Sequence, residues 1–421
     1  MKLKDATKRN QNLYIAQAAV EYLLSLLVTG SFLATITKSI GIPDSITGVL
    51  SSVISLGCSF QLISLFIHKQ KTKGFVIVMS IINQILFLAL YVIPILNISQ
   101  HLKTILFAVV IVAAYFVYNI AHPKKINWLM SNVDENHRGI FTANKEIISL
   151  VAGMAFSYGA GALSDYFAEK GDINTAFILF AALSVVLTLV HTITLLPITE
   201  EGVYAEKKVN FGEALRSLFK NKNIVKVVIL FAIYYVIKDI AAPFYGVYQI
   251  NDLGFSLKLV TVLTVVSSIS RILVSRFLGR YADRKGFATM VEKCFIFLTL
   301  GYAFVAFATP TTGVVMFIGY YVCNGIAMGG INSAITNMVF YYIEPERRAD
   351  SLAVSQAVAG IIGFLTTIAV SPLVTLIQKD GNRFLGIPIY AQQFLSVLAV
   401  VMCVVAVIFV RLAIIGKNKA E

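Results

Sequence analysis

The sequence predicts an all-α membrane protein in which twelve transmembrane helices form two six-helix bundles related by pseudo-symmetry. Twelve long apolar stretches follow one another between positions 12 and 414. Hydrophobic residues make up 57% of the chain and charged residues only 14%, whereas a water-soluble protein has roughly a quarter charged residues. Short segments of the first half also recur in the second half. These three observations leave little of the chain for a water-soluble domain.

Each apolar stretch is close to the length that one membrane crossing needs, because a hydrocarbon core about 30 Å thick takes ~20 helical residues. In the first half we expect helices at 12–37, 46–67, 75–96, 103–131, 145–163 and 174–196. In the second half we expect them at 224–250, 256–278, 288–308, 312–341, 352–378 and 388–414. The domains are then an N-terminal bundle at 1–196, a linker at 197–223 and a C-terminal bundle at 224–421.

The linker contains a segment whose apolar residues share one face of a helix. Phe211, Leu215, Leu218 and Phe219 lie on that face, and Lys220 follows them. A basic amphipathic segment of this kind is typical of a helix that lies on a membrane surface. It acts either as a strap on the inner lipid surface or as a binding site for a regulatory partner.

The net charge of +13 is explained by membrane orientation and does not require nucleic acid as a partner. If the N-terminus is inside, most of the 35 lysines and arginines fall in the inner loops and at the two termini. Cytoplasmic loops carry such an excess of basic residues. We therefore expect a multi-pass protein of the plasma membrane with both termini in the cytoplasm.

Residues at a constant spacing match between the two halves. The matches after the fourth and tenth helices pair Asn127 with Asn337, Asp134 with Glu344, Arg138 with Arg348 and Gly153 with Gly363. The tripeptide KGF at 73–75 recurs at 285–287. Because six crossings return the chain to its starting side, the two halves have the same orientation in the membrane.

The segment between the expected eighth and ninth helices reads GRYADRKG at 279–286. It resembles the loop signature Gly-x-x-x-Asp-Arg-x-Gly of the major facilitator superfamily. The twelve helices, the duplication and the central linker extend this resemblance over essentially the whole chain. The resemblance implies a transporter whose halves rock about a central site, and parallel repeats of this kind place the site at their interface near the bilayer midplane.

The physical chemistry of this segment suggests a conformational latch. Gly279 and Gly286 permit close approach and positive φ, and Asp283 offers a carboxylate to the positive N-terminus of a facing helix. The resemblance identifies that helix as the fifth, so we expect Asp283 and Arg284 to close the inner mouth against Lys145. The alternative is a solvated basic turn.

Other inner loops are also expected to take part in the inner gate. Arg138 and Arg348 are expected to contribute to it from the repeated loops. In the first half, the segment HKQKTKG at 68–74 lacks the acidic residue, so we expect the inner gate to be asymmetric.

Four ionisable residues lie inside the expected helices: Glu21, Lys238, Asp239 and Arg271. Each costs ~2.5–3.5 kcal/mol on insertion scales, so a chain that keeps them should use them. Because neighbours on a helix point ~100° apart, Lys238 and Asp239 should not neutralise each other. We expect Asp239 to pair with Arg271, and Lys238 with Glu21 across a central cavity. They are either functional charges of that cavity or purely structural pairs.

The fourth helix carries a second polar cluster. Its candidate solute-binding residues are Asn119, His122, Lys124 and Trp128, and Tyr234 on the seventh helix joins them. Cations and amides beside the kink expected at Pro123 would suit an anionic or hydroxyl-rich solute. Alternatively, the lysines extend to the lipid headgroups. Trp128 is either an interface anchor or a stacking platform. Buried amides such as Gln17 and Gln84 are expected to bond between helices.

These observations favour a secondary active transporter that moves a small polar organic solute across the plasma membrane by alternating access. Glu21 and Asp239 make the proton the expected coupling ion. The alternatives are a proton antiporter that exports amphipathic drugs or metabolites, and a membrane sensor that has lost transport. No nucleotide-binding loop, metal-ligand spacing or catalytic set appears in the sequence. We therefore expect no enzyme activity, cofactor, metal site or nucleic-acid partner, and a monomer whose partners are the solute and the bilayer.

Overall fold

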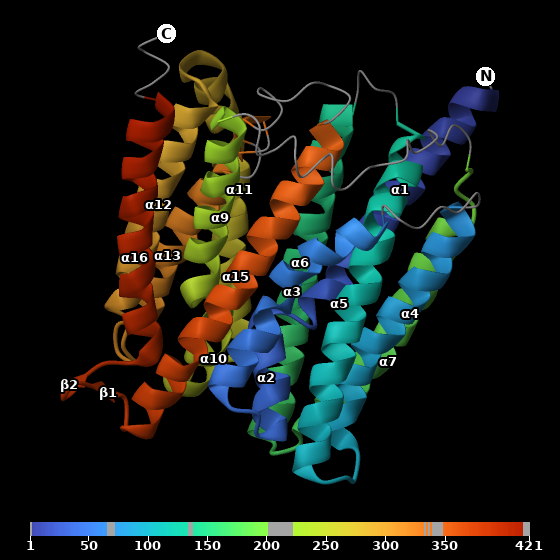
Figure 1. The fold of residues 1–421 in the computed structure, drawn as a ribbon. Helices are drawn as coiled ribbons and strands as arrows, with labels where there is room; N and C mark the ends of the chain where they lie inside the picture. Colours follow the sequence, from blue (N-terminus) through green and yellow to red (C-terminus); the bar gives the residue numbers. More distant parts are fainter. Residues whose placement is uncertain are drawn as a thin grey trace. The chain divides into compact units, whose positions relative to one another are not determined.

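A computed structural model confirms the all-helical membrane fold (Figure 1). It describes residues 2–64, 72–133, 138–200, 222–331, 334–335, 337–338 and 348–415. Within this part of the chain, ten helical segments are long and apolar enough to cross a membrane, and a shorter apolar helix accompanies them. Each of the twelve predicted stretches contains a described helix. The amphipathic helix predicted in the linker and most of the segment 68–74 lie outside the described residues.

The first half of the chain forms long helices with short connections. They are α1 Lys2–Leu26, α2 Gly30–Ile40, α3 Asp44–Ser64, α4 Thr72–Val92, the 3₁₀ turn η1 Ile93–Ile95, α5 Gln100–Met130, α6 Arg138–Glu169 and α7 Ile173–Leu195. The first crossing consists of α1 and α2, which are separated at 27–29. In contrast, α5 stays one helix through Pro123.

The second half is more irregular. It consists of α9 Lys222–Ala241, η3 Ala242–Phe244, α10 Tyr245–Val247, η4 Tyr248–Asp252, α11 Leu257–Lys285, α12 Phe287–Ala306, α13 Gly313–Met328, α15 Arg348–Lys379, β1 Arg383–Phe384, β2 Ile387–Pro388, α16 Ala391–Phe409 and η6 Val410–Ile415. The seventh crossing changes to a 3₁₀ turn after Ala241, because Pro243 has no N–H to continue the helix. The loop before α16 forms a small antiparallel hairpin with Phe384 opposite Ile387.

Contacts divide the chain into two compact units, each described here by itself. The first unit contains Met1–Pro43, Phe60–Lys208 and Ser256–Thr261, and the second contains Asp44–Ser59, Val209–Phe255 and Val262–Glu421. This division departs from the two sequence halves at two places, since most of α3 packs in the second unit and the first turn of α11 packs in the first.

In the first unit, α4 packs against α5 and α7, and α1 packs against α6 and α7. Trp128 belongs to its buried apolar core, which also contains Tyr14, Phe75 and Phe141. Lipid-exposed positions carry apolar residues such as Val78 and Val109. Polar residues therefore occur mainly where these helices face one another.

At one end of the first unit, α6 holds the first turn of α11. The two carboxylate oxygens of Asp165 accept hydrogen bonds from the backbone N–H groups of Leu257, at 2.8 Å, and Lys258, at 2.7 Å. One turn earlier on α6, Gly161 lies so close to this turn that an added Cβ would be 3.1 Å from the Cα atom of Lys258. The ammonium of Lys258 lies 5.3 Å from the ring centroid of Tyr158. Tyr158, Gly161 and Asp165 thus form a clasp on the start of α11.

In the second unit, α9 packs against α15 and α16, and α12 packs against α13 and α16. Its core contains a set of aromatic rings in mutual contact: Tyr245, Tyr248, Tyr302, Phe317, Tyr320 and Tyr321. Asp44 at the start of α3 accepts hydrogen bonds from the amides of Asn251, at 2.7 Å, and Gln378, at 2.8 Å. This carboxylate therefore connects three segments of the second unit.

Candidate functional site

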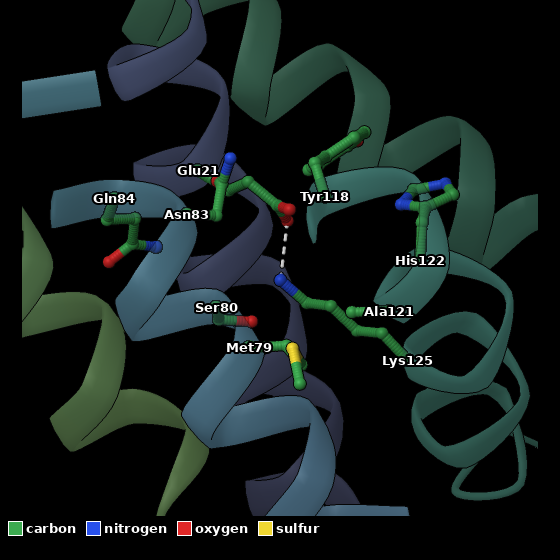
Figure 2. Close-up of a pocket in the computed structure, with 9 residues that line it drawn as sticks. All are labelled: Glu21, Met79, Ser80, Asn83, Gln84, Tyr118, Ala121, His122 and Lys125. Atoms are coloured by element: carbon green, nitrogen blue, oxygen red, sulfur yellow. Dashed lines mark hydrogen bonds and ion pairs between the residues drawn. The ribbon is translucent and has the colours of Figure 1, made fainter. Parts of the chain in front are cut away.

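A polar pocket lies inside the first unit, between α1, α4 and α5 (Figure 2). Its lining residues are Glu21, Met79, Ser80, Asn83, Gln84, Tyr118, Ala121, His122 and Lys125. It has room for about one water molecule. The pocket is thus far smaller than the ~300–1,000 Å³ of a site that encloses an organic ligand.

Helical periodicity explains why these side chains converge. On α5, Tyr118, His122 and Lys125 are spaced at i, i+4 and i+7, so they share one face. On α4, Ser80, Asn83 and Gln84 follow the same rule. Each helix therefore presents one polar stripe to its neighbours and apolar residues to lipid.

An ion pair between α1 and α5 dominates the pocket. The Nζ atom of Lys125 lies 2.7 Å from Oε2 of Glu21, and the Lys125 side chain is only 3% exposed. Figure 2 shows the two side chains pointing toward one another. We expected Lys238 to be the partner of Glu21, and this assignment is corrected, since Glu21 takes Lys125 from its own unit. The pair leaves the two groups together without net charge.

His191 of α7 lies behind this ion pair and is fully buried. Its Nε2 atom lies 3.1 Å from Nζ of Lys125 and 3.1 Å from Oε1 of Gln17. Its Nδ1 atom lies 2.9 Å from Nε2 of Gln84. The sequence analysis missed His191 as a functional residue, although a single histidine in the apolar stretch 174–196 was a signal for it.

Two polar atoms beside the pocket are buried without a hydrogen-bond partner among the described residues. They are Oε1 of Gln84 and Nδ1 of His122. The His122 ring also contacts the Tyr118 ring, with 5.0 Å between their centroids. Buried polar atoms normally find partners, so Nδ1 of His122, which lines the pocket, is available to a bound group.

The other residues predicted on α5 lie outside the pocket. The carboxamide of Asn119 bonds to Gln61 and to the Tyr115 carbonyl. Trp128 is fully buried and donates to the Thr199 carbonyl at 2.9 Å, which corrects its assignment as an interface anchor or stacking platform. Lys124 is also buried, but its neighbour Lys125 is the lysine that lines the pocket.

The second unit contains the other predicted charges. Nζ of Lys238 lies 3.9 Å from Oδ1 of Asp239 and 3.2 Å from Oγ of Ser55. The prediction that Lys238 and Asp239 should not neutralise each other is wrong, because the two side chains form an ion pair. Asp239 is buried, and its ion-pair partner is Lys238 where we expected Arg271.

Close packing surrounds Asp239. An added Cβ at Gly363 of α15 would be 2.2 Å from Oδ2 of Asp239, and this oxygen has no hydrogen-bond partner among the described residues. Tyr234, also buried, directs its hydroxyl to the sulfur of Met328 at 3.5 Å. Arg271 lies on α11 of the same unit.

The predicted latch residues fall at the ends of helices. Gly279, Asp283 and Arg284 belong to the last turns of α11, which extends beyond its predicted end at 278, and Gly286 separates α11 from α12 with φ at 86°. Asp283 and Arg284 are exposed. The ammonium of Lys145 lies 5.1 Å from the ring centroid of Tyr14. Arg138 and Arg348 begin α6 and α15, and their side chains lie outside the described part of the chain.

Metal binding has no evident site in the described residues, since they contain no group of three or more histidine, cysteine, aspartate or glutamate side chains suited to an ion. The pocket instead combines an ammonium, a carboxylate, an imidazole and amides. Such a set recognises polar organic groups by hydrogen bonds.

Comparison with known proteins points to one family. The model of the Major Facilitator Superfamily matches residues 13–367. No curated protein matches the chain.

Several solved structures share the fold. The nucleoside transporter NupG has 15% identity and a TM-score of 0.72, with 96% of this chain and 98% of that chain covered. A bacterial homologue of the human lysosomal transporter Spinster has 14% identity and a TM-score of 0.68, with 97% and 96% covered. A bacterial homologue of the iron transporter ferroportin, in its inward-facing state, has 14% identity and a TM-score of 0.68, with 97% and 100% covered.

Proposed function

Because the chain belongs to the Major Facilitator Superfamily, we propose that it is a secondary active transporter of a small, net-neutral polar solute. It works by alternating access in the plasma membrane, with both termini in the cytoplasm, and a proton gradient drives it. No chemical step is asked of the protein, so its task is to bind the solute, change conformation and release it.

The observation that carries this proposal is the Glu21–Lys125 ion pair in the pocket of the first unit. Charged groups inside a membrane are costly and typically mark substrate or ion pathways. Removing one partner of a buried pair costs ~3–5 kcal/mol, so a solute that separates the pair must replace both partners.

This requirement favours a particular class of solute. An anion would satisfy Lys125 but repel the carboxylate of Glu21, and a cation would do the reverse. A zwitterion or a neutral hydroxyl-rich molecule brings a donor for Glu21 and an acceptor for Lys125 together. The unpartnered Nδ1 atom of His122 supplies a further contact. The sequence predicted an anionic or hydroxyl-rich solute. Because of the ion pair, we propose a zwitterionic or a neutral hydroxyl-rich solute and exclude an anionic one.

The small size of the pocket supports a transport cycle. With room for about one water, the site must widen between α1, α4 and α5 before an organic solute enters. We place the coupling proton on Glu21, and Asp239 with its unpartnered oxygen is the second candidate. A proton on Glu21 would weaken its attraction for Lys125 and lower the cost of opening the site.

The test uses purified protein in liposomes with an imposed pH gradient. We expect uptake of radiolabelled serine or ribose, which represent zwitterionic and hydroxyl-rich solutes, and none of succinate or putrescine. Succinate accumulation without either neutral solute would overturn the solute class. Movement of amphipathic dyes against the proton gradient would favour the exporter, and absence of flux for all solutes would favour the sensor. The Lys125→Met variant is the matched control for flux through this pocket.

A further inference from the structure

His191 of α7 contacts the three helices that form the pocket. Its ring nitrogens face Gln17 of α1, Gln84 of α4 and Lys125 of α5, at 2.9–3.1 Å. Among the described residues, the charged groups that act on it are Lys125 and Glu21. His191 does not line the pocket, so any role in solute binding passes through Lys125 and Gln84, which do.

The chemistry of the donors restricts the form of the imidazole. A lysine ammonium donates hydrogen bonds and cannot accept them, and a neutral imidazole has one N–H and one accepting nitrogen. For the 3.1 Å contact with Lys125 to be a hydrogen bond, Nε2 of His191 must accept and Nδ1 must carry the hydrogen. Nδ1–H then needs an acceptor on Gln84. The Oε1 atom of Gln84 is buried without a partner, and a half-turn of its amide brings it to Nδ1.

The other forms of the ring lose the hydrogen bond with Lys125. With the hydrogen on Nε2, His191 donates to Oε1 of Gln17 and accepts from Nε2 of Gln84, but the contact with Lys125 is no hydrogen bond. With the hydrogen on Nδ1, the bond with Lys125 replaces the bond with Gln17, because Nε2 of His191 and Oε1 of Gln17 are then both acceptors. An imidazolium would place a second positive charge beside Lys125. Hydrogen bonds with a charged partner are roughly twice as strong as neutral ones. The form with the hydrogen on Nδ1 is therefore favoured as long as Lys125 is present.

We propose that His191 is a positioning residue for the solute site: protonated on Nδ1, it accepts a hydrogen bond from Lys125 through Nε2 and holds the ammonium at the pocket. When a solute takes the place of Glu21 at Lys125, this bond keeps the ammonium from following the carboxylate. The role in solute binding rests on the proposed function, but the hydrogen position is measured without any solute, so the two can fail separately.

The experiment is nitrogen NMR of the full chain labelled with ¹⁵N-histidine in lipid nanodiscs, without added solute. The His191→Gln variant assigns the His191 signals among the five histidines. We expect the wild type to carry its hydrogen on Nδ1. In the double variant Glu21→Gln/Lys125→Met, which removes both charges together, we expect the hydrogen to move to Nε2 and bond Gln17.

Each outcome decides the proposal. A wild-type protein with its hydrogen on Nε2, or with a doubly protonated ring, overturns it. A double variant that keeps the hydrogen on Nδ1 also overturns the proposal, because Lys125 then does not determine which ring nitrogen carries the hydrogen. The signals of His101, which is exposed at the start of α5, should not change and serve as the internal control. If this double variant fails to fold, Glu21→Gln/Lys125→Leu replaces it, since it also removes both charges and leaves no donor at position 125, with the same expected move to Nε2.

Discussion

The ammonium of Lys125 has two partners that come from different helices, the carboxylate of Glu21 and the imidazole of His191. At 3% exposure it has almost no contact with water. A charge in this position depends on its partners, since desolvation is costly without them. These two partners explain why a charged pair that is costly to bury is retained in the membrane.

The first prediction concerns the coupling proton. Glu21→Gln keeps the size of the side chain but cannot bind and release a proton. We expect accumulation driven by a pH gradient to be lost, while binding and exchange of solute across the liposome membrane remain. Asp239→Asn is the matched variant in the second unit. Unchanged pH-driven accumulation in Glu21→Gln would exclude Glu21 as the coupling acid and transfer that role to Asp239.

The second prediction concerns the stability of the pair. Lys125→Met leaves the Glu21 carboxylate without its counter-ion, which should cost ~3–5 kcal/mol and lower the thermal unfolding midpoint of the purified protein. Adding Glu21→Gln removes the stranded charge, so the double variant should recover most of this loss. If the two substitutions were simply additive, the groups would not be energetically coupled.

At the scale of elements, helix starts are held by acidic side chains from other segments. Asp165 of α6 holds the start of α11, and Glu200 accepts from the N–H groups of Thr72 and Lys73 at the start of α4. The first backbone N–H groups of a helix have no partner within it and carry a partial positive charge. A carboxylate satisfies both needs, so these contacts set where the helices begin.

The clasp on α11 gives the third prediction. Asp165→Ala removes both acceptors from the first turn, and loss of such a cap typically costs ~0.5–2 kcal/mol. We expect a lower unfolding midpoint and faster amide hydrogen exchange at 257–260. Asp380→Ala, at an exposed position of another outer loop, is the control and should have little effect. Equal shifts in the two variants would show that Asp165 has no special role.

The fourth prediction concerns the inner latch. If Asp283 closes the inner mouth, then Asp283→Asn should favour inward-open molecules and reduce transport while expression is unchanged. Spin-label distances between the inner ends of α6 and α11 would show the change. Arg280→Gln, one turn earlier on α11, is a control for loss of charge alone. Unaltered distances in Asp283→Asn would leave the segment as a solvated basic turn.

At the scale of the whole molecule, long apolar helices with basic inner loops define how the chain lies in a bilayer. Ten of the described helical segments are long and apolar enough to be such spans, and the bias of basic residues predicts the orientation. Lipid does not distinguish one apolar helix from another, so helix association depends on close packing and on polar contacts. This explains why the polar networks around Lys125 and Asp239 lie between helices.

The fifth prediction tests the orientation. In a chain whose four cysteines are replaced, a cysteine at Asn382 should react with an impermeant thiol reagent added outside intact cells. A cysteine at Asn210 should react only after the membrane is permeabilised. The opposite labelling pattern would reverse the topology.

The fold class, the apolar stretches and the resemblance to a family could be predicted from the amino-acid sequence, because apolar length and loop charge are local properties of the chain. It also identified Glu21 and Asp239 as costly residues that needed partners. Helical periodicity shows which face of a helix is polar, but it does not show which helix meets that face.

The partners of these charged residues became evident from the packing of the helices. In the structure, Glu21 pairs with Lys125 and Asp239 pairs with Lys238. Trp128 lies in the core, and His191 lies behind the Glu21–Lys125 ion pair. A lysine side chain is long enough to reach several neighbouring helices, and its choice among them depends on helix order and tilt. Those are set by the packing of all the helices in a unit, which no single segment encodes.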